Sequence, residues 1–222
     1  SVHVDTPIDE VVQTIEKYDL VAVPVVDSIG RLVGQITVDD VMDEVREQSE
    51  RDYQLASGLS QDVETDDNLV RQTSARLPWL LIGMLGGIGN SMILGNFDTT
   101  FAAHPEMALY IPLIGGTGGN VGTQSSAIIV QGLANSSLDA KDTLKQVGKE
   151  AVVAAINATI ISLLVYIYNF VRFGSAATVT YSVSISLFAV VMFASIFGTL
   201  VPMTLEKLKV DPAIATGPFI SI

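Results

Sequence analysis

The sequence predicts a multi-pass α-helical membrane protein with an N-terminal soluble α/β piece. A spanning helix takes about 20 mainly apolar residues. Four stretches without a formal charge reach that length: 77–97, 107–138, 151–171 and 173–205. The formal net charge is −12, and nearly all of it lies ahead of these stretches. The chain therefore divides into an acidic soluble part and a nearly neutral membrane part.

Residues 1–50 have the pattern of a small α/β unit. Apolar residues at helical spacing from Ile8 to Ile15, with Pro7 ahead of them, predict a helix over residues 8–18. Short apolar runs predict strands over 20–26 and 32–38, joined by a turn at 28–31. Asp39 is placed to cap a second helix.

This second helix carries a row of acidic side chains. Asp40, Asp43, Glu47 and Glu50 are spaced by three, four and three residues, which places them on one helical face. Like charges in such a row repel, and a hard cation such as Mg²⁺ held against another acidic surface would relieve the repulsion. An ordinary solvated helix face is the alternative interpretation, and composition alone leaves both open.

Residues 53–76 join the soluble part to the first span. We expect a helix from about Leu69 to Leu77 that ends near Pro78, because proline disrupts helical hydrogen bonds. This position suits a segment that transmits force to the membrane part. A passive linker fits the composition equally well.

The second span carries polar groups where lipid would exclude them. Residues 112–126 hold five glycines together with amide and hydroxyl side chains, yet no formal charge occurs from residue 107 to residue 138. Polar side chains and irregular backbone are tolerated at membrane depth where protein or a water-filled cavity surrounds them. This segment is therefore the predicted lining of a permeation path.

The loops and the composition narrow the class of protein further. Loops rich in Lys and Arg alternate with loops nearly free of them, which predicts a cytoplasmic N-terminal part. The acidic balance argues against nucleic acid, and the absence of cysteine excludes thiolate metal sites. His3 and His104 have no catalytic partner at a suitable spacing within the spans, so we expect no enzyme.

Two motifs resemble known families. Residues 23–41, from Val23-Pro24-Val25 to Asp39-Asp40-Val41, are similar to the end of a cystathionine-β-synthase-type (CBS) module, with a generic β-α-β-β-α piece as the alternative. The element order and the second span resemble the MgtE family of magnesium transporters and channels. The motif in that span comprises Pro112, Gly116, Gly118, Gly119, Asn120, Gly122 and Gln124. Residues 201–213 also resemble the family.

The resemblance implies a homodimer in a cell (inner) membrane, with a central magnesium-selective pore. Cytosolic Mg²⁺ closes this pore by binding at acidic surfaces of the CBS region and the connecting helix. It places Mg²⁺ in the pore at Gly116, Gly119, Asn120, Thr123, Gly217 and Ser221. The regulatory sites that we expect are Asp19, Asp40, Asp43, Glu47 and Glu50. Mg²⁺ is thus both substrate and regulator, lipid surrounds the spans, and ATP at the CBS region is left open.

The expected domains are 1–52, the second half of a CBS-type region; 53–76, a plug-like connecting helix; and 77–222, a pore domain cut in its fifth span. We therefore expect a piece of a longer protein, with a paired module before Ser1 and an acidic pore residue after Ile222. Co²⁺ or Mn²⁺ transport is one alternative. A CBS-type sensor subunit without its own pore is another, although such a subunit has no need for the run from Gly115 to Gln124.

Overall fold

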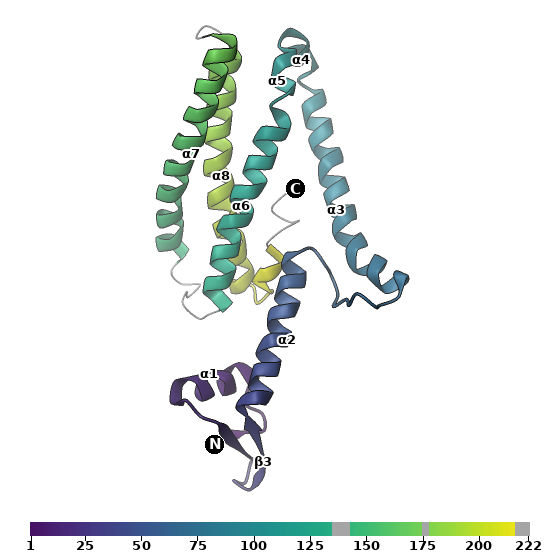
Figure 1. Ribbon diagram of the computed structural model, residues 1–222, viewed down its shortest axis with the longest axis vertical. Helices are drawn as coiled ribbons and strands as arrows, with labels where there is room; N and C mark the ends of the chain where they lie inside the picture. The colour runs from purple at the N-terminus through teal and green to yellow at the C-terminus, as the bar shows by residue number, and fades with distance from the viewer. Residues whose placement is uncertain (135–142, 175–177, 216–222) are drawn as a thin grey trace. The chain divides into compact units, whose positions relative to one another are not determined.

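The computed structural model describes residues 1–134, 143–174 and 178–215. It is mainly helical, with a three-stranded sheet near the N-terminus (Figure 1). The chain divides into two compact units, Ser1–Tyr53 and Gln54–Ile222.

The first unit is a small α/β fold. Its elements are β1 (Val2–His3), α1 (Ile8–Tyr18), β2 (Ala22–Val26), β3 (Leu32–Thr37) and the start of α2 (Val38–Ala56). The sheet has the order β1-β2-β3, with β1 parallel and β3 antiparallel to β2. One face of α1 closes the core through Val11 and Ile15, which pack with Val2, Val23 and Val41. The helix over residues 8–18 is confirmed, and each strand is slightly shorter than expected.

A hydrogen-bonded turn joins β2 to β3. The Asp27 carboxylate accepts from the backbone N–H groups of Ile29 and Arg31 at 3.0 and 2.9 Å. Gly30 has φ +80°, a left-handed conformation that a Cβ atom would strain. The hydrogen bond from the Arg31 backbone is the main reason that the pKa of Asp27 is lowered.

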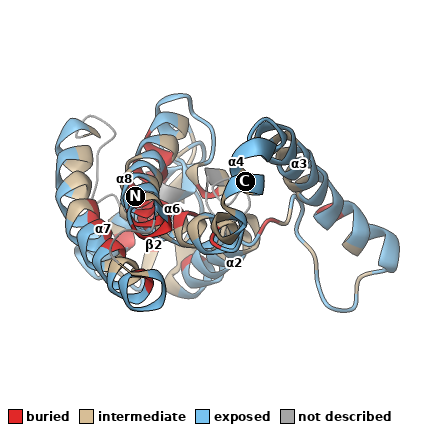
Figure 2. Ribbon diagram, turned by 90° about the horizontal axis from the view of Figure 1, so that it is seen from above, coloured by how far each residue is buried: buried red, intermediate tan, exposed pale blue. Residues whose placement is uncertain are grey.

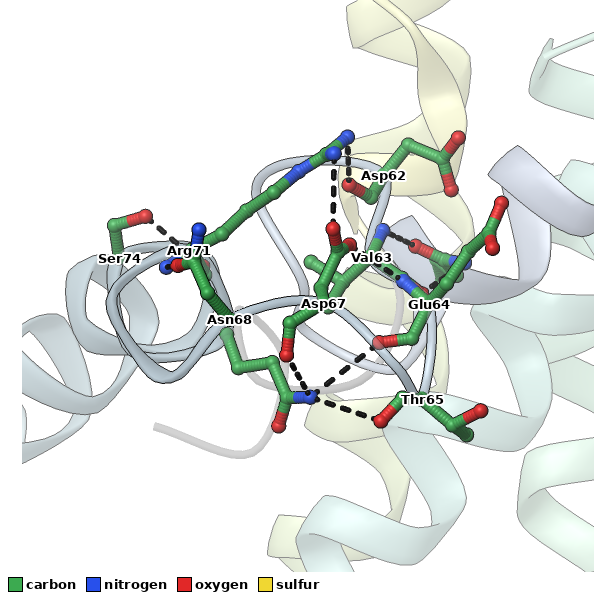
Figure 3. A network of polar contacts seen from close by, with 10 residues as sticks. Asp62, Val63, Glu64, Thr65, Asp67, Asn68, Arg71 and Ser74 are labelled. Carbon is green, nitrogen blue, oxygen red and sulfur yellow. Dashed lines mark hydrogen bonds and ion pairs between the residues drawn. The ribbon is translucent and has the colours of Figure 1, made fainter.

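The segment between α2 and the next helix is held by side chains. Asn68 caps α3 (Leu69–Gly95) by accepting from the Arg71 N–H at 2.9 Å. The Arg71 guanidinium donates to the Asp67 carboxylate at 3.0 Å and to the Asp62 carbonyl at 3.1 Å (Figure 3). Gln54, near the end of α2, bonds both the N–H and the carbonyl of Val63. These contacts give residues 57–68 a defined path.

The expected helix end near Pro78 is wrong, because α3 runs through Pro78 to Gly95. Proline has no N–H to donate to the carbonyl four residues earlier and crowds the preceding turn. The carbonyl that lacks this donor is that of Ser74. The next carbonyl, that of Ala75, accepts from the N–H and the hydroxyl of Ser60 at 2.9 and 3.0 Å. The preceding segment therefore bonds to α3 in the turn ahead of its proline.

The helices α6 (Ile111–Ala134), α7 (Thr143–Phe173) and α8 (Thr178–Lys207) pack side by side (Figure 1). The short helices α4 (Asp98–Ala103) and α5 (Pro105–Ala108) lead from α3 to α6, and η2 (Pro212–Ala215) packs against α8. The core between the three long helices includes Ala158, Leu187 and Val191. Buried positions concentrate on α8, whereas α3 is almost wholly exposed (Figure 2).

Three helices of the described chain are long and apolar enough to cross a membrane, namely α3, α7 and α8. The 24 residues of α6 would extend over about 36 Å at the helical rise of about 1.5 Å per residue, so its length also suffices. Glycines and polar side chains lower its hydropathy. The three apolar helices confirm the multi-pass class.

Glycines allow α6 and α8 to approach closely. A Cβ on Gly118 would lie 2.7 Å from Cγ1 of Val190, and one on Gly198 would collide with the Gly122 carbonyl oxygen. Small residues at such crossings are the usual basis of helix association in membranes.

We therefore expect Gly198→Ala to force α6 and α8 apart and to cost about 1–3 kcal/mol, as overpacking does. The matched control is Gly148→Ala on α7, where a Cβ meets nothing within 4 Å. This control should be neutral or stabilising by up to about 1 kcal/mol, because alanine favours the helix. Unfolding temperatures in detergent check the pair, and equal temperatures for both variants would contradict the close crossing.

Candidate functional site

Helix α6 has a packed face. Its buried residues are Gly118, Gly122, Ser125, Ser126 and Ile129, whose spacings of four, three, one and three residues keep them on one side of the helix. Gly118 and Gly122 lie against α8, as described above. This face therefore fixes the rotation of α6 about its own axis.

The expected pore residues lie away from that packed face. Gly116 and Asn120 are exposed, and Gly119 and Thr123 are half-buried. Their spacing of three, one and three residues places them on one side of the helix. A Cβ on Gly116 would meet nothing within 4 Å, so the backbone there is open to a large ligand. The structure thus brings these four residues together on what we call the open face of α6.

The chemistry of the open face suits a hydrated hard cation. Oxygen donors are what Mg²⁺ prefers, and Mg²⁺ sheds its water reluctantly. The Asn120 amide oxygen and the Thr123 hydroxyl can accept hydrogen bonds from ion-bound water. Glycine at two of the four positions lets a wide hydrated ion approach the backbone carbonyls. Without a carboxylate, this face alone would bind a cation weakly.

The other two expected pore residues, Gly217 and Ser221, lie outside the described residues. The chain leads toward them through η2, which packs against α8 and α6. Asp211 accepts from the Ala213 N–H at 2.8 Å at the start of this turn.

The acidic row of α2 is confirmed as a helical feature, because Asp40, Asp43, Glu47 and Glu50 are all exposed on α2. Two arginines of the same helix partly neutralise it. Arg51 pairs with Glu47 at 2.7 Å and with Glu44 at 3.3 Å, and Arg46 pairs with Glu50 at 3.0 Å. Exposed pairs of this kind contribute about 0.2–1 kcal/mol each and are screened by salt. An incoming cation would therefore displace weak partners.

Asp40 and Asp19 have local structural roles in the first unit. The Asp40 carboxylate accepts from the Thr37 hydroxyl at 2.6 Å and from the Thr37 N–H at 2.8 Å. These hydrogen bonds lower the pKa of Asp40, and the hydroxyl contributes most. Asp19 ends α1 in the left-handed conformation, with φ 50°.

Within the described residues, no three His, Cys, Asp or Glu side chains come together as a metal site. A cation at the acidic row would therefore need ligands from a further surface, as the sequence interpretation supposed. Carboxylates of a single helix face point outward and do not enclose an ion.

Sequence reasoning missed two polar contacts between the membrane helices. Glu150 on α7 accepts from Ser125 of α6 at 2.7 Å and from Ser195 of α8. Tyr110, directly before α6, donates to the buried Asn169 of α7. Glu150 could have been noticed as the only acidic residue adjoining the charge-free stretch 151–171, but its partners are distant in sequence.

The fold and the site together define a class: an integral membrane protein with several spanning helices, one of them polar on its open face, and an N-terminal α/β unit. Comparison with known proteins agrees with this class. Residues 111–222 match the profile of the MgtE family, described as divalent cation transporters, and residues 1–47 match that of the CBS domain. The chain belongs to the MgtE family and carries a CBS domain piece.

Three relatives share the name magnesium transporter MgtE. The protein of Bacillus subtilis strain 168 is 33% identical over 213 residues, 96% of this chain and 47% of the relative. That of Enterococcus faecalis is 33% identical, over 100% of this chain and 48% of the relative. That of Thermus thermophilus is 34% identical, over 99% of this chain and 49% of the relative. The chain thus spans about half the length of the relatives that it matches.

Proposed function

We propose that the protein conducts Mg²⁺ across a cell (inner) membrane as a homodimer, along a path lined by the open face of α6. The observation that carries the proposal is that this helix packs through one face and presents glycine, amide and hydroxyl groups on the other. Its three named relatives are magnesium transporters. Two open faces, one from each copy, would surround a hydrated ion without exposing polar groups to lipid.

Closure of the path by cytosolic Mg²⁺ is the second part of the proposal. The ion would bind the acidic row of α2, together with acidic groups of another surface, and Asp19 would contribute from the end of α1. A ligand shifts an equilibrium only by its differential affinity for the two states. A shift from 1:99 to 99:1 needs about 5.5 kcal/mol, so several ions must act together.

The domain boundaries fit this scheme. Residues 1–52 would sense the ion, 53–76 would transmit the change, and 77–222 would hold the path. The hydrogen-bonded segment 57–68 supports a transmitting role, because a segment fixed by side-chain contacts passes on displacement better than a loose one. ATP is included in the proposal as a further ligand of the CBS piece.

Asn120→Leu in the complete protein should reduce Mg²⁺ uptake to background, because leucine cannot bond ion-bound water. Asn157→Leu is the matched control, since Asn157 is an exposed amide on α7, outside the open face. Uptake into vesicles, corrected for the amount of inserted protein, measures both variants. Normal Mg²⁺ uptake by Asn120→Leu protein that has inserted correctly would show that the Asn120 side chain does not line the path.

The proposed topology places α4 outside and the start of α7 in the cytoplasm, with the first unit also cytoplasmic. Cysteines introduced at Thr100 and at Lys145, both exposed, should react with an impermeant thiol reagent from opposite sides of the membrane. Labelling of both positions in intact cells would contradict the proposed number of spans between them.

Neutralising Asp40, Asp43 and Glu47 together should leave the complete channel open at high internal Mg²⁺, whereas neutralising Asp43 alone should raise the closing concentration only modestly. The matched control is neutralisation of Asp5, Glu10 and Glu16, three exposed acids of the first unit outside the row. Patch recordings at stepped internal Mg²⁺ give the closing concentration. Unchanged closure in the first triple variant would show that the acidic row is an ordinary solvated helix face.

A further inference from the structure

Glu150 lies where the three packed helices meet. It is half-buried on α7, near the start of the charge-free stretch, and its Oε1 atom accepts from the hydroxyls of Ser125 on α6 and Ser195 on α8. Both serines are almost fully buried, with 4% and 2% of their surface exposed. One carboxylate oxygen therefore joins three helices.

The hydrogen-bond arrangement depends on this acceptor. The two serine Oγ atoms lie 2.9 Å apart, and each hydroxyl has a single proton. Either both protons point to Glu150, or one serine donates to the other, which then donates to Glu150. Every arrangement ends at the carboxylate. Its removal would leave a buried hydroxyl without its acceptor, which is costly in a setting of low polarity.

The contact lies on the packed face of α6, at the height of the open face. Ser125 is two residues from Thr123, or about 3 Å along the helix axis. One turn earlier, Gly122 meets Gly198 of α8, and on α8 Ser195 is one turn before Gly198. The glycine contact lets the helices approach, but it has no directional bond to fix their relative height. The Ser125–Glu150–Ser195 contact supplies one.

We propose that Glu150 is a positioning residue of the ion path: its carboxylate fixes α6 against α8 and thereby sets where the open face lies. The inference rests on the proposed function of that face. The side chain acts through Ser125 and Ser195 and does not itself touch the ion. Its role is that of a hydrogen-bond acceptor, which an amide oxygen of the same length can also fill.

The test uses the complete protein in vesicles and records Mg²⁺ uptake against Mg²⁺ concentration. Glu150→Gln keeps an acceptor oxygen and should stay within about twofold of the natural protein in rate and in half-saturating concentration. Glu150→Leu should lower the uptake rate about tenfold, the size expected from losing a charge-assisted hydrogen bond, and should change the half-saturating concentration. Glu206→Leu, at an exposed acid near the end of α8, is the control and should change neither.

Two results would overturn the proposal: natural uptake by Glu150→Leu, or a loss in folded Glu150→Gln as large as that in Glu150→Leu.

A double-mutant cycle with Ser195→Ala, measured as unfolding temperatures, covers the case in which Glu150→Leu is poorly folded. Ser195→Ala should lower the unfolding temperature of the natural protein and of Glu150→Gln, which keeps the acceptor oxygen. It should have little further effect in Glu150→Leu, which has already lost the acceptor. Additive effects with Glu150→Leu would refute the contact itself. If the natural protein moves no Mg²⁺, the proposed function fails, and the cycle alone still decides whether Glu150 fixes the helices.

Discussion

The close crossing of α6 and α8 is the constraint on which the membrane part depends. Gly118 and Gly122 let α8 approach one side of α6, and Gly198 removes the side chain that would obstruct it. Because this packing fixes the rotation of α6, it also decides that Gly116 and Asn120 face away from the bundle. The same helix thus serves as a packing surface and as the proposed lining of the path.

Polar groups on the two sides of α6 are accommodated differently. On the packed side, Ser125 has its partners inside the chain, in Glu150 and Ser195. On the open side, Asn120 and the glycine backbone face outward, where lipid would be a poor neighbour. Water, an ion or a second copy of the chain would each satisfy these groups, and the proposed path between two copies would supply all three.

Local pattern predicted α1, α2 and the long helices α6, α7 and α8, together with the acidic row and the polar character of α6. Helical spacing and charge can be read directly from the sequence. It did not predict the short helices α4 and α5. It failed at Pro78, because a helix can run through a proline where its surroundings support it, and spacing alone does not show those surroundings. It also missed Glu150, whose partners lie 25 and 45 residues away. Such contacts depend on how helices pack, which single-helix periodicity does not specify.

The central claim is that one side of α6 lines a water-filled path while the other is packed. Single cysteines introduced along α6, one per variant, and treated with a small charged thiol reagent test it most directly. We expect reaction at Gly116, Asn120 and Thr123, slowed by Mg²⁺, and none at Gly118, Ser125 and Ile129. Reaction at the second set, or equal reaction around the helix without protection by Mg²⁺, would contradict the account.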